Sequence, residues 1–159
     1  MAVTVLKHIK EARNRSPSSH LKNAIKYIMN PKKTEDGLWI GGNGGNTPDA
    51  VYKAMIDTKT DYGKLYGRQG YHFVVSFAPG EADAETTYLI GQEFCRKYLG
   101  DNYDYAFAVH DDQHHSHCHI IFNSVNRMNG SKYRYVDGDW RKFIQPVTDE
   151  ICIKRGLPP

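Results

Sequence analysis

The sequence predicts an α+β fold in which a largely antiparallel β-sheet carries helices on one or both faces. Two observations support this fold class. Apolar, β-prone segments alternate along the chain with segments whose apolar residues recur at helical spacing. Two of the β-prone segments, 105–109 and 120–125, flank a polar connection, as neighbouring strands do. No internal repeat and no linker divides the chain, so we expect residues 1–159 to form one domain.

The first third of the chain is expected to form a strand, a helix and a second, short strand. Residues 2–9 are apolar at positions that would point to both faces of a strand, so we expect this strand to be buried on both sides. Ser18 or Ser19 is expected to cap the following helix, which Pro31 ends. Residues 38–40 predict a short strand, and the glycine-rich run after them predicts a flexible turn.

The rest of the chain is expected to add three helices and four strands. Residues 70–77, Gly-Tyr-His-Phe-Val-Val-Ser-Phe, are the clearest strand in the sequence. The pair Asn129-Gly130 is a strong hairpin signal and predicts a last strand over residues 132–136. Thr47 is expected to cap a helix that has a proline at its first position. The helices expected in this part cover residues 47–60, 83–98 and 140–154.

Length and composition narrow the class of protein. A chain of 159 residues that is 40% hydrophobic can bury a sizeable core. No apolar run reaches membrane-spanning length, and the start of the chain lacks the basic and apolar regions of a signal peptide, so we expect no membrane insertion. Three widely spaced cysteines favour reduced thiols, which indicates a cytoplasmic protein.

The charge distribution permits nucleic-acid binding. The net charge is +3, and basic side chains gather between Lys7 and Lys33, where Glu11 is the only acidic residue. Such a run is either a solvated helix face or a surface that faces phosphates. Arg13 and Arg15 belong to it and are candidate contacts to a phosphate backbone.

The most informative stretch is a cluster of histidines. Five of the eight histidines lie between His110 and His119. His117 and His119 begin a strand, and because side chains alternate across a strand they point to the same face. Two imidazoles side by side on a rigid strand can chelate one divalent metal. The spacing does not fit a structural zinc knuckle, so we expect a site with open positions for water or substrate.

The third ligand of this site has three candidates. His114 and His115 lie in the polar connection, and a chain so tight would have to fold back sharply to aim either ring at the same face. If His110 pairs with His117 across antiparallel strands, its ring lies directly opposite. We therefore predict a metal site formed by His110, His117 and His119, with His114 and His115 in solvent. We expect the ion to be Mg²⁺ or Mn²⁺, with Zn²⁺ as an alternative.

Tyr27 lies on the first predicted helix, about 100° from the centre of its apolar stripe. An aromatic side chain at the edge of a stripe is usually a half-buried packing residue. Its neighbours Ser19, Lys22 and Lys26, however, surround it with phosphate-binding chemistry.

Three segments taken together are similar to a known family. Lys26-Tyr27-Ile28 comes first, the strand Tyr71–Phe77 with a following Gly-Glu pair comes second, and His110 with His117-Cys118-His119 comes third. In this order they resemble the relaxases of conjugative and mobilizable elements, which belong to the His-hydrophobe-His endonucleases, and above all the MobP-type mobilization relaxases. Cys118 departs from the family, which usually has an aliphatic residue there; a buried cysteine behaves as a small hydrophobe and should be tolerated.

The resemblance implies roles for individual residues. Tyr27 stands at the position of the nucleophile, and Ser19 matches a serine used near the cleaved strand. Asp112 stands at the acidic position of the third motif and would orient a ligand histidine, although an ordinary turn aspartate is the alternative. His72 would assist from the central strand, with a hydrogen-bonded core histidine as the alternative. Asn123 would touch DNA or bond a neighbour.

The candidate DNA-binding residues that follow are Ser19, Lys22, Lys26, Arg68, Asn123 and Arg127.

The implied activity is site- and strand-specific nicking and rejoining of DNA at a transfer origin, with a metal and a 5′-phosphotyrosyl intermediate. The implied partners are single-stranded DNA at the nick site, adjacent hairpin or duplex DNA, accessory relaxosome proteins and a type IV secretion coupling protein in the bacterial cytoplasm. Relaxases of this type usually continue past the catalytic domain, so we expect a fragment of a longer protein. The alternatives are a rolling-circle replication initiator and a non-catalytic, metal-stabilised nucleic-acid-binding module.

Overall fold

The computed structural model describes residues 2–112 and 115–158, with all of their side chains except that of Asp112. The strands are β1 (Val3–Ile9), β2 (Ile40–Gly42), β3 (Gly70–Ser76), β4 (Tyr105–Asp112) and β5 (His115–Asn123). The helices are α1 (Ser19–Ile28), α2 (Pro48–Asp61), α3 (Ala84–Phe94) and α4 (Gln145–Lys154), with π-helical segments at Cys95–Leu99 and Trp140–Ile144.

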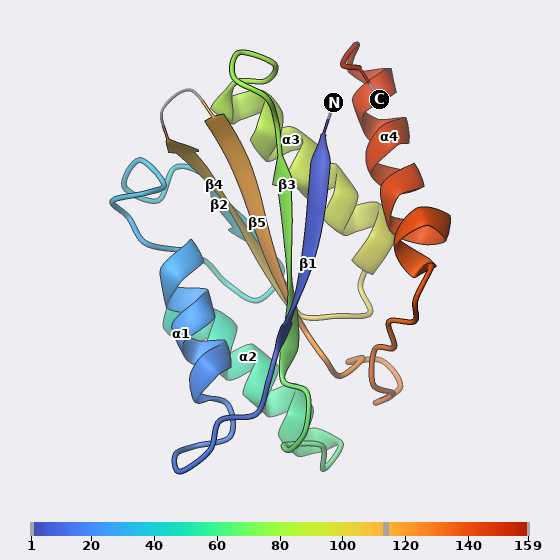
Figure 1. The fold of residues 1–159 in the computed structure, drawn as a ribbon. Coiled ribbons are helices and arrows are strands. Elements are labelled where there is room, and N and C mark those ends of the chain that lie inside the picture. The colour runs from blue at the N-terminus through green and yellow to red at the C-terminus, as the bar shows by residue number, and fades with distance from the viewer. Residues whose placement is uncertain (1, 113–114, 159) are drawn as a thin grey trace.

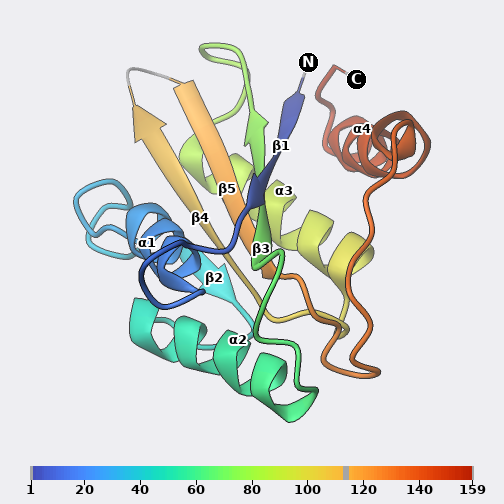
Figure 2. The same cartoon turned by 60° about the horizontal axis from the view of Figure 1, so that its bottom comes forward.

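The five strands form one antiparallel sheet in the order β1-β3-β5-β4-β2. Helices α1 and α2 cover one face of the sheet, and α3 and α4 cover the other (Figures 1 and 2). The predicted α+β class with a largely antiparallel sheet is confirmed. No helix in the described part of the chain has both the length and the apolar character needed to cross a membrane.

Helix α1 packs closely against the sheet because the strand beneath it carries small residues. Leu21, Ile25 and Ile28 recur at helical spacing on α1 and are completely buried. They meet Ala106 and Ala108 of β4 in one core cluster. This packing, together with the contact of His110 with the backbone oxygen of Ile28, fixes α1 along β4 and decides which side chains of the helix lie over the histidines.

The opposite face of the sheet holds a larger, aromatic core under α3 and α4. Phe73, Phe107 and Phe122 point into it from three neighbouring strands. Cys118 lies in the same core, and a Cβ atom on Gly91 of α3 would collide with its sulfur. The unusual cysteine between the two histidines is therefore a buried packing residue, as expected from its small apolar side chain.

The first strand is not buried on both sides, so that prediction is wrong. β1 is an edge strand, and its side chains Val3 and Val5 are 57% and 45% exposed. Thr4 is buried on the other face, and Ile9, at the far end of the strand, is buried on the face of Val3 and Val5 against α1. The sequence has apolar residues at positions that point to both faces of the strand. It does not show that α1 and α2 stop short of this corner of the sheet.

One turn prediction also needs correction. Part of the glycine-rich run is strand, since Gly41 and Gly42 of β2 pair with β4. Side chains there would collide with Phe107 and with the backbone of Tyr105, which explains the glycines. Thr47, by contrast, caps α2 as predicted, with its hydroxyl accepting a hydrogen bond from Ala50 N at 3.2 Å.

The predicted strand over residues 132–136 does not form. The chain does turn at Gly130, which has a φ of 77°. After the turn the described pairing is a single bridge between Val125 and Lys132. The ring of Tyr133 then packs into the core, 4.9 Å from the ring of Phe122, so the chain leaves the sheet instead of extending it.

Candidate metal and nucleophile site

The sheet register brings three histidines to the face that α1 covers. His117 and His119 share one face of β5, and His110 of β4 is paired with His117. The ring centres of His110 and His119 are 4.3 Å apart, and those of His117 and His119 are 6.5 Å apart. The predicted position of His110, directly across from His117, is confirmed. Its role as a metal ligand stays a prediction.

His110 is held in one orientation by helix α1. Its ring is buried, and Nε2 lies 2.8 Å from the backbone oxygen of Ile28. A carbonyl oxygen only accepts hydrogen bonds, so Nε2 carries the proton and Nδ1 carries the lone pair. A metal-binding histidine usually donates its other ring N–H to a backbone carbonyl or carboxylate in this way. If His110 binds a metal, it does so through Nδ1.

His117 and His119 are oriented by side chains of β3. Nδ1 of His117 lies 3.0 Å from Ser76 Oγ, and Nδ1 of His119 lies 2.9 Å from His72 Nε2. Both contacts leave Nε2 as the nitrogen directed to other partners. The predicted placement of His72 on this face of the sheet is therefore confirmed, and its assisting role stays a prediction.

Three imidazoles are suitable ligands for a divalent ion, but the distances between these three rings are not all those of rings bound to one ion. With metal–nitrogen bonds of about 2.0–2.1 Å, the centres of two ligand rings lie roughly 5 Å apart. The separation of 4.3 Å between His110 and His119 is close to that value, whereas 6.5 Å between His117 and His119 is too long. Accordingly, no three His, Cys, Asp or Glu side chains in the described residues already have metal-binding geometry. His117 would have to turn toward the other two.

The structure corrects the prediction for His115. β5 begins at His115 rather than at His117, so this residue belongs to the strand and shares the face of His117. It is half-buried, and its ring stacks on His117 with the centres 6.0 Å apart. Its position in solvent was wrongly predicted because pairing continues to the end of both strands.

Two predictions from this segment lie outside the described part of the chain. His114 is not described, so its expected exposure stays a prediction. The backbone of Asp112 is paired with that of His115, while its side chain lies outside the described side chains. Its proposed role in orienting a histidine therefore also stays a prediction.

Tyr27 lies over the histidines. It is in the last turn of α1 and its side chain is 50% exposed. Its ring stands edge-on to the rings of His110 and His119, with the centres 5.6 Å and 6.0 Å apart. A phenol oxygen and a group of imidazoles thus share one accessible place, which no single sequence motif could establish.

Burial makes two of these imidazoles hard to protonate. Burial, followed by the charges of Lys7 and His110, lowers the pKa of His72 to about 4. Burial and then the neighbouring His110 and His72 lower the pKa of His119 to about 2. Both rings are neutral at pH 7, which is the form that binds metals.

These shifts predict that the metal-free protein loses stability in mild acid. Below about pH 6.5 the unfolded chain takes up protons on His72 and His119 while the folded chain does not. The contribution of these two histidines to the free energy of unfolding should therefore be constant above pH 7 and fall steadily from pH 6.5 to pH 4. Urea unfolding across this range measures the slope, which His72→Asn should reduce and His20→Ala, at an exposed position, should not. An equal slope in His72→Asn would contradict the assignment.

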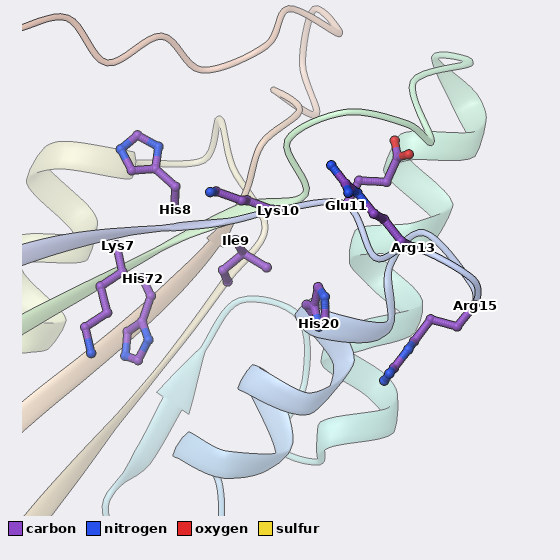
Figure 3. Close-up of a pocket in the computed structure, with 9 residues that line it drawn as sticks. All are labelled: Lys7, His8, Ile9, Lys10, Glu11, Arg13, Arg15, His20 and His72. Carbon is purple, nitrogen blue, oxygen red and sulfur yellow. The ribbon is translucent and has the colours of Figure 1, made fainter.

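A basic cleft of about 650 Å³ opens beside the histidines (Figure 3). His72 forms part of its wall and also contacts His119, so the cleft adjoins the histidine group. Lys7 lies next to His72 because the two are paired in β1 and β3. The other basic side chains that line the cleft are His8, Lys10, Arg13, Arg15 and His20.

Sequence reasoning missed two contacts here, which strand alternation reveals once the order of the strands is known. Ser76 lies four residues after His72, on the same face of β3, and reaches His117. Lys7 lies on the face of β1 that continues this row. Neither residue type is diagnostic by itself, so both would have required the strand order to be known.

The predicted DNA-binding residues of α1 lie along one flank of the helix, three and four residues apart. Lys22 Nζ lies 5.4 Å from the ring centre of Tyr52 on α2. Lys26, four residues later, follows on the same flank and is exposed. Ser19 is half-buried in the first turn. DNA contacts by these three stay predictions; they lie on the helix of Tyr27 but do not line the basic cleft.

Arg68 and Arg127 lie at the other end of the sheet. Arg68 precedes β3 and its guanidinium lies 5.8 Å from the ring centre of Tyr71. Arg127 follows β5, and its Nε donates to the backbone oxygen of Asp101 at 2.7 Å. The register pairs Gly70 with Asn123 at this end, whereas His117 is at the opposite end. The structure does not bring either arginine to the histidines.

Asn123 is buried and not accessible to DNA in this structure, so the structure does not support its predicted contact with DNA. Its side chain is completely buried under α2. Its amide nitrogen donates to the backbone oxygen of Met55 and to Asp104 Oδ2, each at 3.0 Å, and its oxygen accepts from Lys59 Nζ at 2.6 Å. The alternative reading, a hydrogen bond to neighbours, is the correct one.

Lys59 is the buried charge that sequence reasoning missed. Its Nζ also donates to the backbone oxygen of Gln69 at 2.7 Å, and burial lowers its pKa to about 7. Gln69 in turn accepts a hydrogen bond from Ser18, which sits at the start of α1 without capping it. This network ties α1 and α2 to the sheet. The clue was the position of Lys59 on the apolar stripe of α2 with Val51 and Met55.

The fold and the histidine-lined face define a nuclease domain of the relaxase class. A solved structure described as "Molecular Basis of Vancomycin Resistance Transfer in Staphylococcus aureus" shares the fold, with a TM-score of 0.60 at 11% identity over 99% of this chain and 95% of the other. The nuclease-domain model of the MobA/VirD2-like relaxases matches residues 27–157. The chain belongs to this family, as the sequence motifs indicated.

Named relatives agree with this membership. Protein rlx of Staphylococcus aureus is 41% identical over 157 residues, which cover 99% of this chain and 44% of the relative. The group II intron-interrupted relaxase LtrB of Lactococcus lactis is 28% identical and covers 90% of this chain and 31% of the relative. Protein TraI of Escherichia coli is 30% identical over 112 residues, which cover 68% of this chain and 15% of the relative. The chain spans less than half the length of these relatives.

Proposed function

We propose that this chain nicks and rejoins one DNA strand at a transfer origin, with Tyr27 as the nucleophile. The observation that carries the proposal is the half-exposed ring of Tyr27 over His110 and His119, in a chain of the relaxase family. The family membership favours DNA transfer over the rolling-circle alternative.

The reaction is a transesterification. The Tyr27 oxygen attacks phosphorus and gives its proton to solvent, which reaches the half-exposed phenol. A bond forms between that oxygen and phosphorus, the bond from phosphorus to the 3′ oxygen breaks, and the 3′ oxygen takes up a proton from solvent. The products are a 5′-phosphotyrosyl link and a free 3′-hydroxyl, and the reverse reaction rejoins the strand.

The histidines would hold a divalent ion, Mg²⁺ or Mn²⁺, with His110 using Nδ1 and His117 and His119 using Nε2. Such an ion would supply Lewis-acid polarisation of a phosphoryl oxygen, which favours attack by a phenol oxygen, a weak nucleophile at neutral pH. His72 and Ser76 would orient the rings behind it. In this proposal residues 1–159 act as one catalytic domain.

The basic cleft would hold phosphates of the strand beside the cleavage point, because it adjoins the histidines through His72. The proposed partners are single-stranded DNA at the nick, hairpin or duplex DNA next to it, relaxosome accessory proteins and a type IV secretion coupling protein. Their recognition would use surfaces beyond the histidine face.

Binding to single-stranded DNA should weaken steeply with salt. Contacts to about 4–6 phosphates give a slope of about −3 to −4 in a plot of log affinity against log salt. Replacing both Arg13 and Arg15 by Ala should make this slope shallower by about 1.4. Replacing Arg141 and Lys142, in the π-helical segment before α4, is the matched control and should leave the slope unchanged. A salt-independent affinity would remove the cleft from the proposal.

A labelled oligonucleotide that carries the transfer origin tests the function directly. Incubation with the protein and Mn²⁺ should give a covalent protein–DNA band on a denaturing gel and a shorter product with a free 3′-hydroxyl. Chelation of the metal should abolish both. Tight binding without any covalent band would instead support a non-catalytic binding module.

A further inference from the structure

A row of imidazoles continues along β5 beyond the site described above. His115, His117 and His119 occupy every second position and share one face. The ring of His117 is 6.0 Å from that of His115, with the planes 15° apart. It is 6.5 Å from the ring of His119, with the planes 46° apart. On its own strand, His117 is therefore nearer to His115 than to its proposed catalytic partner.

We propose that His115 and His117 form a second metal-binding pair that takes Zn²⁺, Cu²⁺ or Ni²⁺. Two stacked imidazoles on one strand need only a small rotation to meet the same ion. Imidazole nitrogen suits these ions, whereas Mg²⁺ and Mn²⁺ prefer oxygen ligands and would not be held by two rings alone. Both rings are half-buried, so an ion can enter from solvent.

The pair competes with the proposed catalytic site for one nitrogen atom. Nδ1 of His117 is engaged by Ser76 Oγ at 3.0 Å. The remaining nitrogen, Nε2, can bind only one ion at a time. An ion on His115 and His117 therefore withdraws His117 from His110 and His119, and excess zinc should inhibit nicking. This inhibitory consequence rests on the proposed function; the binding of metal to the pair does not.

The surroundings of the pair favour a cation. His115 is at the end of the sheet away from the basic cleft, four residues, or about 13 Å along the strand, from His119. It is paired in the backbone ladder with Asp112 of β4. The lysines and arginines of the cleft lie beyond His72, on the far side of His119.

Metal titration separates the two sites. Metal-free protein titrated with Zn²⁺ in a calorimeter should show two binding events, because the second ion takes His117 and leaves the first ion on His110 and His119. Mg²⁺ should not produce the second event. His115→Ala should lose the weaker event and keep the tighter one, whereas His119→Ala should keep the weaker one. His8→Ala is the matched control, because this imidazole faces Tyr71 on the other side of β1. A second event that persists in His115→Ala would overturn the pair, as would a single event in the wild type.

The inhibition is measured in the nicking assay at fixed Mn²⁺ with added Zn²⁺. Wild-type activity should fall at least tenfold as zinc fills the weaker site, and His115→Ala should resist this inhibition with unchanged activity before zinc is added. If the weaker event depends on His115 but no nicking is found under any condition, the metal pair stands and the proposed function fails. If nicking occurs and zinc inhibits both proteins equally, the shared-ligand inference fails alone.

Discussion

Replacing Tyr27 by Phe should abolish the covalent adduct with DNA while leaving oligonucleotide affinity within a few-fold. The substitution removes the attacking oxygen and keeps the ring that stands edge-on to His110 and His119. The loss of nicking should be at least about a thousandfold, as for the removal of other nucleophiles. Adduct formation on a denaturing gel and fluorescence anisotropy of a labelled oligonucleotide measure the two quantities separately.

Another tyrosine provides the control for this experiment. Tyr66 is 67% exposed and lies in the segment before β3, at the end of the sheet away from the histidines. Tyr66→Phe removes the same oxygen from a solvent-accessible ring and should form the adduct normally. If Tyr27→Phe still forms the adduct, another of the 11 tyrosines is the nucleophile.

The elements of the fold were predictable because their signals are local. Helical spacing on α1 and alternation in β3 are properties of short segments, and turn residues mark where most of them end. Which helices cover each face of the sheet depends on contacts between distant parts of the chain, and short segments do not reveal it. Val3 and Val5 were expected inside, but they lie at the uncovered edge of the sheet. Tyr133 likewise leaves the predicted strand because its ring fits the core.

The site residues likewise include some that the sequence placed correctly and some that it did not. His110 could be placed opposite His117 because an antiparallel hairpin fixes the register of both strands. His115 was misplaced because the sequence does not show how far the pairing extends. Asn123 was correctly placed on the histidine face, yet the approach of α2 and Lys59 buries it. Alternation gives the direction of a side chain, and only the helix above decides whether it meets solvent.

Replacing His110 by Ala should lower metal affinity at least tenfold and nearly eliminate nicking. The ring of His110 is 4.3 Å from that of His119, the best-placed pair of the proposed ligands. The same change with His115 should leave metal affinity for Mn²⁺ and nicking near wild-type values, because this ring is beyond His117. Calorimetry with Mn²⁺ and the nicking assay measure both effects.

Part of the loss in His110→Ala has a structural origin, which a second variant separates. Alanine leaves the backbone oxygen of Ile28 without its donor in a buried place, at a cost of about 1–3 kcal/mol. That bond also links the end of α1, and hence Tyr27, to β4. His110→Gln offers an N–H to the same carbonyl but no imidazole. If His110 is a ligand, Gln should restore stability without restoring metal binding. Recovery of nicking in His110→Gln, or a metal-soaked crystal with His115 bound and His110 turned away, would show that His110 only positions the helix.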